Sequence, residues 1–269
     1  YDIKPLAYTY DWGMVTDLAR RNQSRMCSEL GIEHIIVSAD IKRKRDNIKS
    51  NVSAWLKKPD LGLVPLFMAG DKQFYYYANQ LSKQNNIKKV MFSENLFEKT
   101  FFKSGFCGIK PSFNQSNTYT MSAVNKLKLI GYYGKGYLEN SGYLNKSLID
   151  TMGAFISYYA IPHNYLWQFQ YLAWNENISD EILLNQYNWE VATDTDSTWR
   201  IGDGTAPFYN YIYYIMAGFT ENDSLRSNQI REGHITRNKG LELVERDNRP
   251  RFDSLKWYFD AIGVDMELA

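Results

Sequence analysis

Acidic and amide side chains follow directly after three segments that have the pattern of β-strands. Asp11 follows an aromatic run, and Asp40 follows a run of β-branched residues. Glu94 and Asn95 follow a third apolar run. Ligands of an open parallel sheet bind beyond the carboxyl ends of its strands, so these loops are candidate binding or catalytic sites. The alternative is that each Asp or Asn only caps the turn or helix that comes next.

A glycine-rich turn at residues 199–205 is the second candidate site. Arg200 precedes two glycines that flank Asp203, and a helix is predicted to begin at Thr205. Backbone amides at a helix start, together with an arginine, can hold a phosphate or a carboxylate. The alternative is a simple turn in which Asp203 caps the helix.

Two arginines lie in a predicted helix at residues 224–232. Arg226 and Arg231 are five positions apart and therefore point in directions about 140° apart on a helix. They do not form a single anion-binding fork. We expect a solvated, salt-bridged helix end in which Arg226 pairs with Asn222 or Asp223.

Histidines and cysteines do not form a recognisable metal site. The three histidines are far apart in the sequence, and Cys27 and Cys107 are the only cysteines. This pattern excludes a zinc site of paired cysteines and a disulfide framework. We therefore predict no metal cluster made of protein ligands alone, and we expect His34, in a strand, to be a packing residue.

Strands and helices alternate through the first part of the chain. The predicted strands are 6–10, 34–38 and 89–93, and the predicted helices are 15–30, 41–56 and 71–84. Strands that are separated by helices favour parallel pairing with helices on both faces of the sheet.

After about residue 111 the pattern becomes almost wholly helical. A polar stretch at 112–122 leads to predicted helices at 126–138, 147–159, 179–187, 205–218, 224–232, 237–247 and 250–262. Ser179 is the predicted N-cap of the third of these helices, and Pro250 fits the first position of the last one. We therefore predict the α/β class, with a Rossmann-like parallel-sheet lobe at 1–111 and a mostly helical lobe at 112–269.

Composition and charge narrow the classes of function. The 269 residues are 44% hydrophobic and 23% charged, with a formal net charge of +1. This is an ordinary globular composition without a basic field for nucleic acid or an anionic membrane. No apolar run approaches the 18 or so residues of a transmembrane helix. With only two cysteines, a cytoplasmic location is expected.

The first part of the chain resembles the PP-loop ATP pyrophosphatases. Residues 4–11 (KPLAYTYD), 19–22 and 30–35 are similar to the second strand, the following helix and the third strand of that family. Within it, the N-acetyl sugar amidotransferases of bacterial surface-polysaccharide biosynthesis are most similar, and the synthetase domain of asparagine synthetase is more distant. Residues 93–95 resemble the Gly-Glu-Asn that ends a later strand. The resemblance covers 4–40 and 88–108 and is looser over the helical lobe.

Two family features are not found in this sequence. In the family, a Ser-Gly-Gly-x-Asp-Ser loop binds pyrophosphate one helix before the strand that corresponds to residues 4–11. We expect that loop to lie upstream of Tyr1 in the full protein. Many relatives also carry a Cys-x-x-Cys where residues 61–72 contain no cysteine, so a zinc or thiol role is unsupported.

The resemblance implies an ATP-dependent, AMP-forming amidotransferase that acts on a nucleotide- or lipid-linked sugar. ATP with Mg²⁺ would adenylate an amide or carboxylate oxygen, and ammonia from a separate glutaminase subunit would then displace AMP. Thr9, Tyr10 and Asp11 would line the adenine and ribose site. Glu94 and Asn95 would face the reacting centre.

Lys72, Arg200 and Asp203 complete the predicted centre on the basis of their chemistry rather than a motif match. Two other functions stay open. One is a PP-loop sulfurtransferase that acts on RNA, although the near-neutral charge and the lack of a cysteine pair count against it. The other is a non-catalytic binding domain that has lost the phosphate loop. The sequence does not decide whether the chain forms a homo-oligomer.

Overall fold

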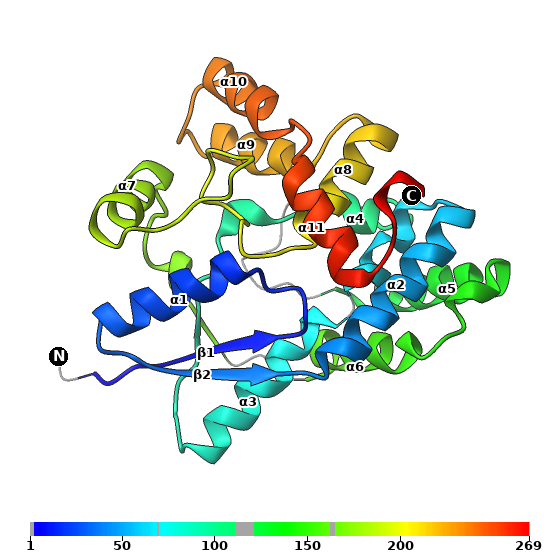
Figure 1. Ribbon diagram of the computed structural model, residues 1–269, viewed down its shortest axis with the longest axis horizontal. Coiled ribbons are helices and arrows are strands. Elements are labelled where there is room, and N and C mark those ends of the chain that lie inside the picture. Colours follow the sequence, from blue (N-terminus) through cyan, green and yellow to red (C-terminus); the bar gives the residue numbers. More distant parts are fainter. Residues whose placement is uncertain (1–2, 69, 111–120, 162–164, 269) are drawn as a thin grey trace. The chain divides into compact units, whose positions relative to one another are not determined.

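The computed structural model describes residues 3–68, 70–110, 121–161 and 165–268 (Figure 1). The chain forms two compact units, which are described separately below. Unit 1 consists of residues 1–41 and 172–268, and unit 2 consists of residues 42–171. The fold is α/β, with many helices and little sheet.

Unit 1 begins with a parallel β-α-β element, as predicted. Strand β1 (Leu6–Asp11) pairs with β2 (Glu33–Ser38) in parallel, and helix α1 (Asp17–Glu29) connects them. Figure 1 shows the two strands side by side with α1 along them. The helix is capped by Thr16, whose hydroxyl accepts a hydrogen bond from the Ala19 N–H, and it is followed by a left-handed glycine at residue 31.

The rest of unit 1 is helical. Its helices are α7 (Glu176–Glu181), α8 (Ala206–Ala217), α9 (Glu221–Arg231), α10 (Arg237–Asp247) and α11 (Phe252–Ile262). Helix α9 packs against α10, and α11 packs against α8. In the second contact, the ring of Phe208 stacks on Tyr258 with a centroid distance of 4.5 Å. The bounds of α10 agree with the predicted 237–247.

The roles predicted for Ser179 as an N-cap and for Pro250 as a first helical residue are both wrong. Helix α7 begins three residues before Ser179, because Asn175 caps it by accepting the Ile178 N–H. It runs into a π-helical turn at Ile182–Gln186. Pro250 lies outside α11, since Arg251 occupies the N-cap position.

Unit 2 contains most of the remaining helices. They are α2 (Ile41–Lys57), α3 (Phe74–Gln84), α4 (Phe102–Gly105), α5 (Ala123–Glu139) and α6 (Ser147–Tyr159). A 3₁₀ segment, Leu61–Met68, follows α2. None of the helices in the described ranges is long and apolar enough to cross a membrane.

The third predicted strand does not extend the sheet of β1 and β2. Strand β3 (Met91–Phe92) pairs in parallel with β4 (Leu166–Trp167) instead. The two-residue strand is held by aromatic packing, because the ring of Phe92 lies 4.8 Å from Tyr165 and 5.5 Å from Tyr75. Residues 111–120, where the predicted lobes at 1–111 and 112–269 meet, lie outside the described residues, and that boundary stays a prediction.

Candidate functional site

Asp11 ends β1 and holds the turn that follows it. It lies opposite Ser38 at the end of β2, and its main-chain oxygen accepts a hydrogen bond from the Ala39 N–H at 2.9 Å. Its carboxylate is 4% exposed. Oδ1 accepts from the Gly13 N–H at 2.9 Å, and Oδ2 accepts from the Arg20 Nη2 at 2.7 Å. Both carboxylate oxygens of Asp11 therefore have partners within the protein, and the bond to Gly13 is the one that the capping alternative expects. A carboxylate has further lone pairs that a ligand could use.

Thr9 and Tyr10 precede Asp11 in the same strand, so their side chains point to opposite faces of the sheet. The Thr9 hydroxyl lies 2.9 Å from the Nε2 of His34 and donates to Gln23 at 3.3 Å. Tyr10 is buried. His34 is thus a hydrogen-bond partner within the sheet, in agreement with the expected packing role.

The turn after β1 is joined to the glycine-rich turn near residue 200. The Gly204 N–H donates to the Met14 carbonyl at 2.9 Å, and the Thr16 N–H donates to the Gly202 carbonyl at 3.2 Å. A Cβ on Gly204 would lie 2.0 Å from the ring of Trp257, so the close approach needs glycine. The structure therefore brings two of the predicted candidate sites together within unit 1.

Asp203 lies in this junction and is half-buried. Its Oδ1 accepts from the Thr205 N–H at 3.0 Å and from the Thr205 hydroxyl at 2.5 Å. The predicted capping alternative therefore accounts for one oxygen. Within the described ranges no hydrogen bond is made by Oδ2, which leaves this oxygen available to a ligand.

Arg200 has an unusual backbone and a tightly held side chain. Its φ is +54°, a left-handed conformation that a residue with a Cβ rarely adopts. Its Nη1 donates to Glu221, which is completely buried, at 2.9 Å and to the Tyr209 hydroxyl, and its guanidinium lies 5.2 Å from the ring of Trp199. Burial raises the pKa of Tyr209 far above its usual value, so this hydroxyl stays protonated. Backbone strain that is stabilised in this way is typical of functional sites.

The other three predicted site residues belong to unit 2. Lys72 forms an ion pair with Asp71 at 3.3 Å, and Glu94 is exposed. Asn95 is 3% exposed and caps a 3₁₀ turn by accepting the Phe97 N–H at 2.9 Å. Its buried Nδ2 has no hydrogen-bond partner in the described part of the chain. Within unit 1 the structure thus joins the turn that follows Asp11, through Met14 and Thr16, to the glycine-rich turn that carries Arg200 and Asp203.

A buried ion-pair cluster around Arg226 was not anticipated, and the expectation of a solvated Arg226 is wrong. Arg226 is 1% exposed, and its guanidinium binds both oxygens of Glu176 and the Oδ2 of Asp247, the latter at 2.8 Å. Arg231 is the solvated residue of the pair. No local pattern indicates the burial of Arg226, because its partners are 50 and 21 positions away in the chain.

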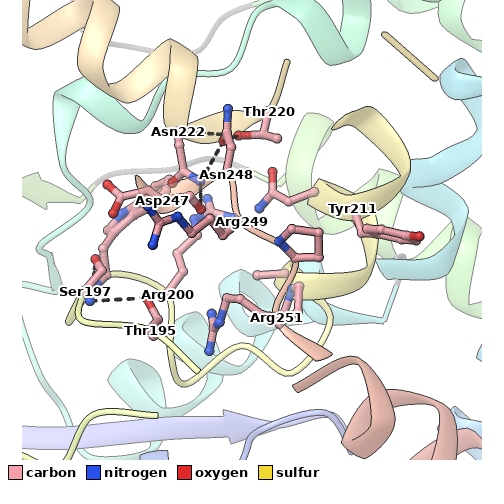
Figure 2. Close-up of a pocket in the computed structure, with 15 residues that line it drawn as sticks. Thr195, Ser197, Arg200, Tyr211, Thr220, Asn222, Asp247, Asn248, Arg249 and Arg251 are labelled. Carbon is pink, nitrogen blue, oxygen red and sulfur yellow. Dashed lines mark hydrogen bonds between the residues drawn. The ribbon is translucent and has the colours of Figure 1, made fainter. Parts of the chain in front are cut away.

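Unit 1 also contains a small pocket, with a volume of about 50 Å³, that reaches from the glycine-rich turn to the start of α11. Figure 2 shows Arg200, Arg249 and Arg251 among the residues that line it. Sequence reasoning had considered only Arg200. Arg249 was missed because it lies in the short connection between two predicted helices, and Arg251 because it lies within the predicted helix 250–262, where it occupies the N-cap position of α11 in the structure.

Neither protein-family models nor curated proteins give a match to this chain. Function must therefore be inferred from the geometry of the site.

Proposed function

We propose that this chain belongs to an ATP-dependent, AMP-forming amidotransferase, a C–N ligase. Its substrate would be a nucleotide- or lipid-linked sugar of surface-polysaccharide biosynthesis in the cytoplasm. In this proposal the β1-α1-β2 element is part of a Rossmann-like nucleotide-binding lobe. The observation that carries the proposal is the junction between the turn after β1 and the glycine-rich turn at 200–205.

The junction supports the use of ATP for two reasons. It lies at the carboxyl ends of two parallel strands, which is where open α/β sheets bind nucleotides. It also contains the guanidinium of Arg200, which Glu221 and the Tyr209 hydroxyl hold in place, and a carboxylate oxygen of Asp203. Arginine is one of the groups that bind phosphate oxygens.

The proposed reaction needs charge stabilisation more than it needs covalent help from the protein. The amide oxygen of the sugar attacks the α-phosphorus of ATP, and the bond to pyrophosphate breaks. Ammonia, supplied by a glutaminase partner, then attacks the activated carbon, and AMP leaves with that oxygen. Positioned donors near the leaving pyrophosphate favour the first of these steps. Arg200 would supply such donors in unit 1, whereas the roles of Glu94, Asn95 and Lys72, which belong to unit 2, stay predictions from the sequence.

Mg²⁺ would accompany ATP, and Asp203 fits a role in holding it. Mg²⁺ in such sites uses one or two carboxylates together with substrate phosphates and water. The Oδ2 of Asp203 makes no protein hydrogen bond among the described residues and could serve as that carboxylate ligand. The ion would neutralise charge on the leaving pyrophosphate.

The test is calorimetric titration of the full-length protein with Mg-ATP, followed by chromatography of the products. We expect binding, and we expect AMP release that depends on ammonium chloride and on a UDP-linked N-acetyl sugar. Asp11→Asn keeps an acceptor for Gly13 but removes the charge beside Arg20, and should weaken ATP binding at least tenfold (about 1.4 kcal/mol). Glu33→Gln, an exposed change at the opposite end of the sheet, is the control.

Three outcomes would contradict the proposal. Release of ADP in place of AMP would indicate phosphoryl transfer. AMP release that requires RNA and a sulfur donor would indicate the sulfurtransferase. Absence of ATP binding by the full-length protein would indicate a non-catalytic binding domain.

A further inference from the structure

The small pocket of unit 1 is bordered by three arginines. Arg200 comes from the glycine-rich turn, and Arg249 and Arg251 come from the connection between α10 and α11 (Figure 2). A water molecule needs roughly 10–15 Å³ of such space, so the 50 Å³ pocket has room for about three to five waters. This is enough for a phosphate or carboxylate group but too small for a whole sugar or a base.

Three helices begin at this pocket. Its lining includes Ala206 and Pro207 at the start of α8, Thr220 at the N-cap of α9, and Arg251 at the N-cap of α11. Helix α10 ends there, at Asp247. Helix starts carry partial positive charge, and at two of them a protein carboxylate already meets it, because Asp223 caps α9 and Asp194 accepts from the Ser254 N–H of α11.

The position of Arg249 is set by a network of amide hydrogen bonds. Asn248 accepts from the Thr220 hydroxyl at 2.5 Å and from Asn222 at 3.2 Å, and it donates to Asp223 at 2.9 Å. The first two of these bonds can be followed in Figure 2. Hydrogen bonds made by the oxygen and the nitrogen of the Asn248 amide therefore hold the turn that carries Arg249.

The remaining charges around the pocket are already paired within the protein. Arg200 binds Glu221, and Arg251 binds Asp194 at 3.1 Å. Asp247, the acidic residue in the lining, is neutralised by Arg226 and Arg246, each at less than 3 Å. Arg249 makes no side-chain hydrogen bond or ion pair among the described residues. One positive charge is thus left without a partner beside the pocket.

We infer that this pocket binds an oxyanionic group, a phosphate or a carboxylate, of the sugar substrate, with Arg249 as the principal cation. The identity of the ligand as the sugar substrate rests on the proposed function, whereas the anion site itself does not. Arginine binds both groups through paired hydrogen bonds. Because the pocket is small, only the anionic end of the ligand enters it, and the rest of the sugar extends outward.

The experiment is a titration of the full-length protein, without ATP, with inorganic phosphate and separately with acetate. Calorimetry gives the affinity, and the side-chain amide NMR signals of Asn222 and Asn248 report on the pocket. We expect phosphate or acetate to shift these signals. Arg249→Gln should weaken that binding at least tenfold, while Arg249→Lys should restore part of it. Arg231→Gln, an exposed arginine of α9 outside the pocket, should leave it unchanged.

The two probes identify the source of the anion. Tighter binding of phosphate indicates a phosphorylated sugar, and tighter binding of acetate indicates a sugar acid. No shift with either probe, or a shift that persists in Arg249→Gln, would overturn the inference. If either of these results is found together with ammonium-dependent AMP release, the anion site is refuted and the proposed function stands. If the pocket binds an anion but the protein binds no ATP, the anion site stands and the sugar substrate is no longer its proposed ligand.

Discussion

Replacement of Arg226 by Met should strongly destabilise unit 1. The substitution keeps a long apolar stem of similar length but removes the guanidinium that joins α9 to Glu176 and Asp247. The Arg226 side chain is 2% exposed, and those of Glu176 and Asp247 are 20% and 5% exposed. The variant would therefore leave two carboxylates of low exposure without their main cation.

The expected loss in the free energy of unfolding depends on how far other residues still neutralise Glu176 and Asp247 in the variant. Breaking a buried ion pair by removing one partner costs about 3–5 kcal/mol. Asp247 keeps an ion pair with Arg246 at 2.7 Å, and Glu176 keeps a hydrogen bond from Gln229 at 3.1 Å. The lower end of the range, about 3 kcal/mol, is therefore expected. For a chain of this size it corresponds to a fall in Tm of roughly 6–12 °C.

Urea unfolding followed by fluorescence measures the effect directly. The matched control is Arg231→Met on the same helix, where the side chain is exposed and binds only Ser227 and Asn228. The control should change the free energy of unfolding by less than about 0.5 kcal/mol. A loss below about 1 kcal/mol for Arg226→Met, or equal losses for both variants, would refute the reasoning. Arg226 would then be the solvated residue that its sequence context suggests.

Two further predictions concern the acid sensitivity and the packing of unit 1. Hydrogen bonds and charge from Arg21 and Arg25 lower the pKa of Glu190 from 4.5 to about 2. Its stabilising contribution is thus complete above about pH 5 and is lost as the pH falls through 2. In urea unfolding, the difference between the wild type and Glu190→Gln should therefore shrink over this range, and a constant difference would contradict the ion-pair explanation. Gly204→Ala should destabilise by about 1–3 kcal/mol because its Cβ would overlap the ring of Trp257. Gly131→Ala, in a helix with open space around it, should be neutral or stabilising, and equal effects of the two changes would argue against the close approach at residue 204.

Helices could be predicted well because their signals are local. The bounds of α10 follow from the apolar spacing between residues 237 and 247, and the end of α1 follows from Gly31, whose φ is +62°. The wrong N-cap at Ser179 also follows from a local signal. Asn175 is an equally good cap four residues earlier, and the choice between them depends on the turn that precedes the helix.

Partners that are distant in the chain could not be predicted. Strand β3 contains two residues, and nothing in its composition selects β4 over β1 as the neighbour. The contact between Thr16 and Ile201 spans 185 positions. Asp11 and Asp203 were predicted as site residues, but the sequence did not indicate that the turns beside them meet. Arg226 shows the same limit, since a charge in a helix is usually solvated unless distant carboxylates enclose it.

Unit 1 is assembled from the two ends of the chain, which has a consequence for its synthesis. Residues 1–41 emerge from the ribosome before unit 2, but the helices that complete their unit begin after residue 171. At about 5–20 residues per second, translation of the intervening segment takes on the order of ten seconds. During this time β1 and β2, which pair only with each other among the described residues, form a sheet that is marginally stable alone. Unit 2, in contrast, is continuous and can fold as it emerges. Unit 2 can thus fold before unit 1 although the first residues of unit 1 are made earlier, and the turn after Asp11 meets the turn of Arg200 and Asp203 only after residue 203 has been made.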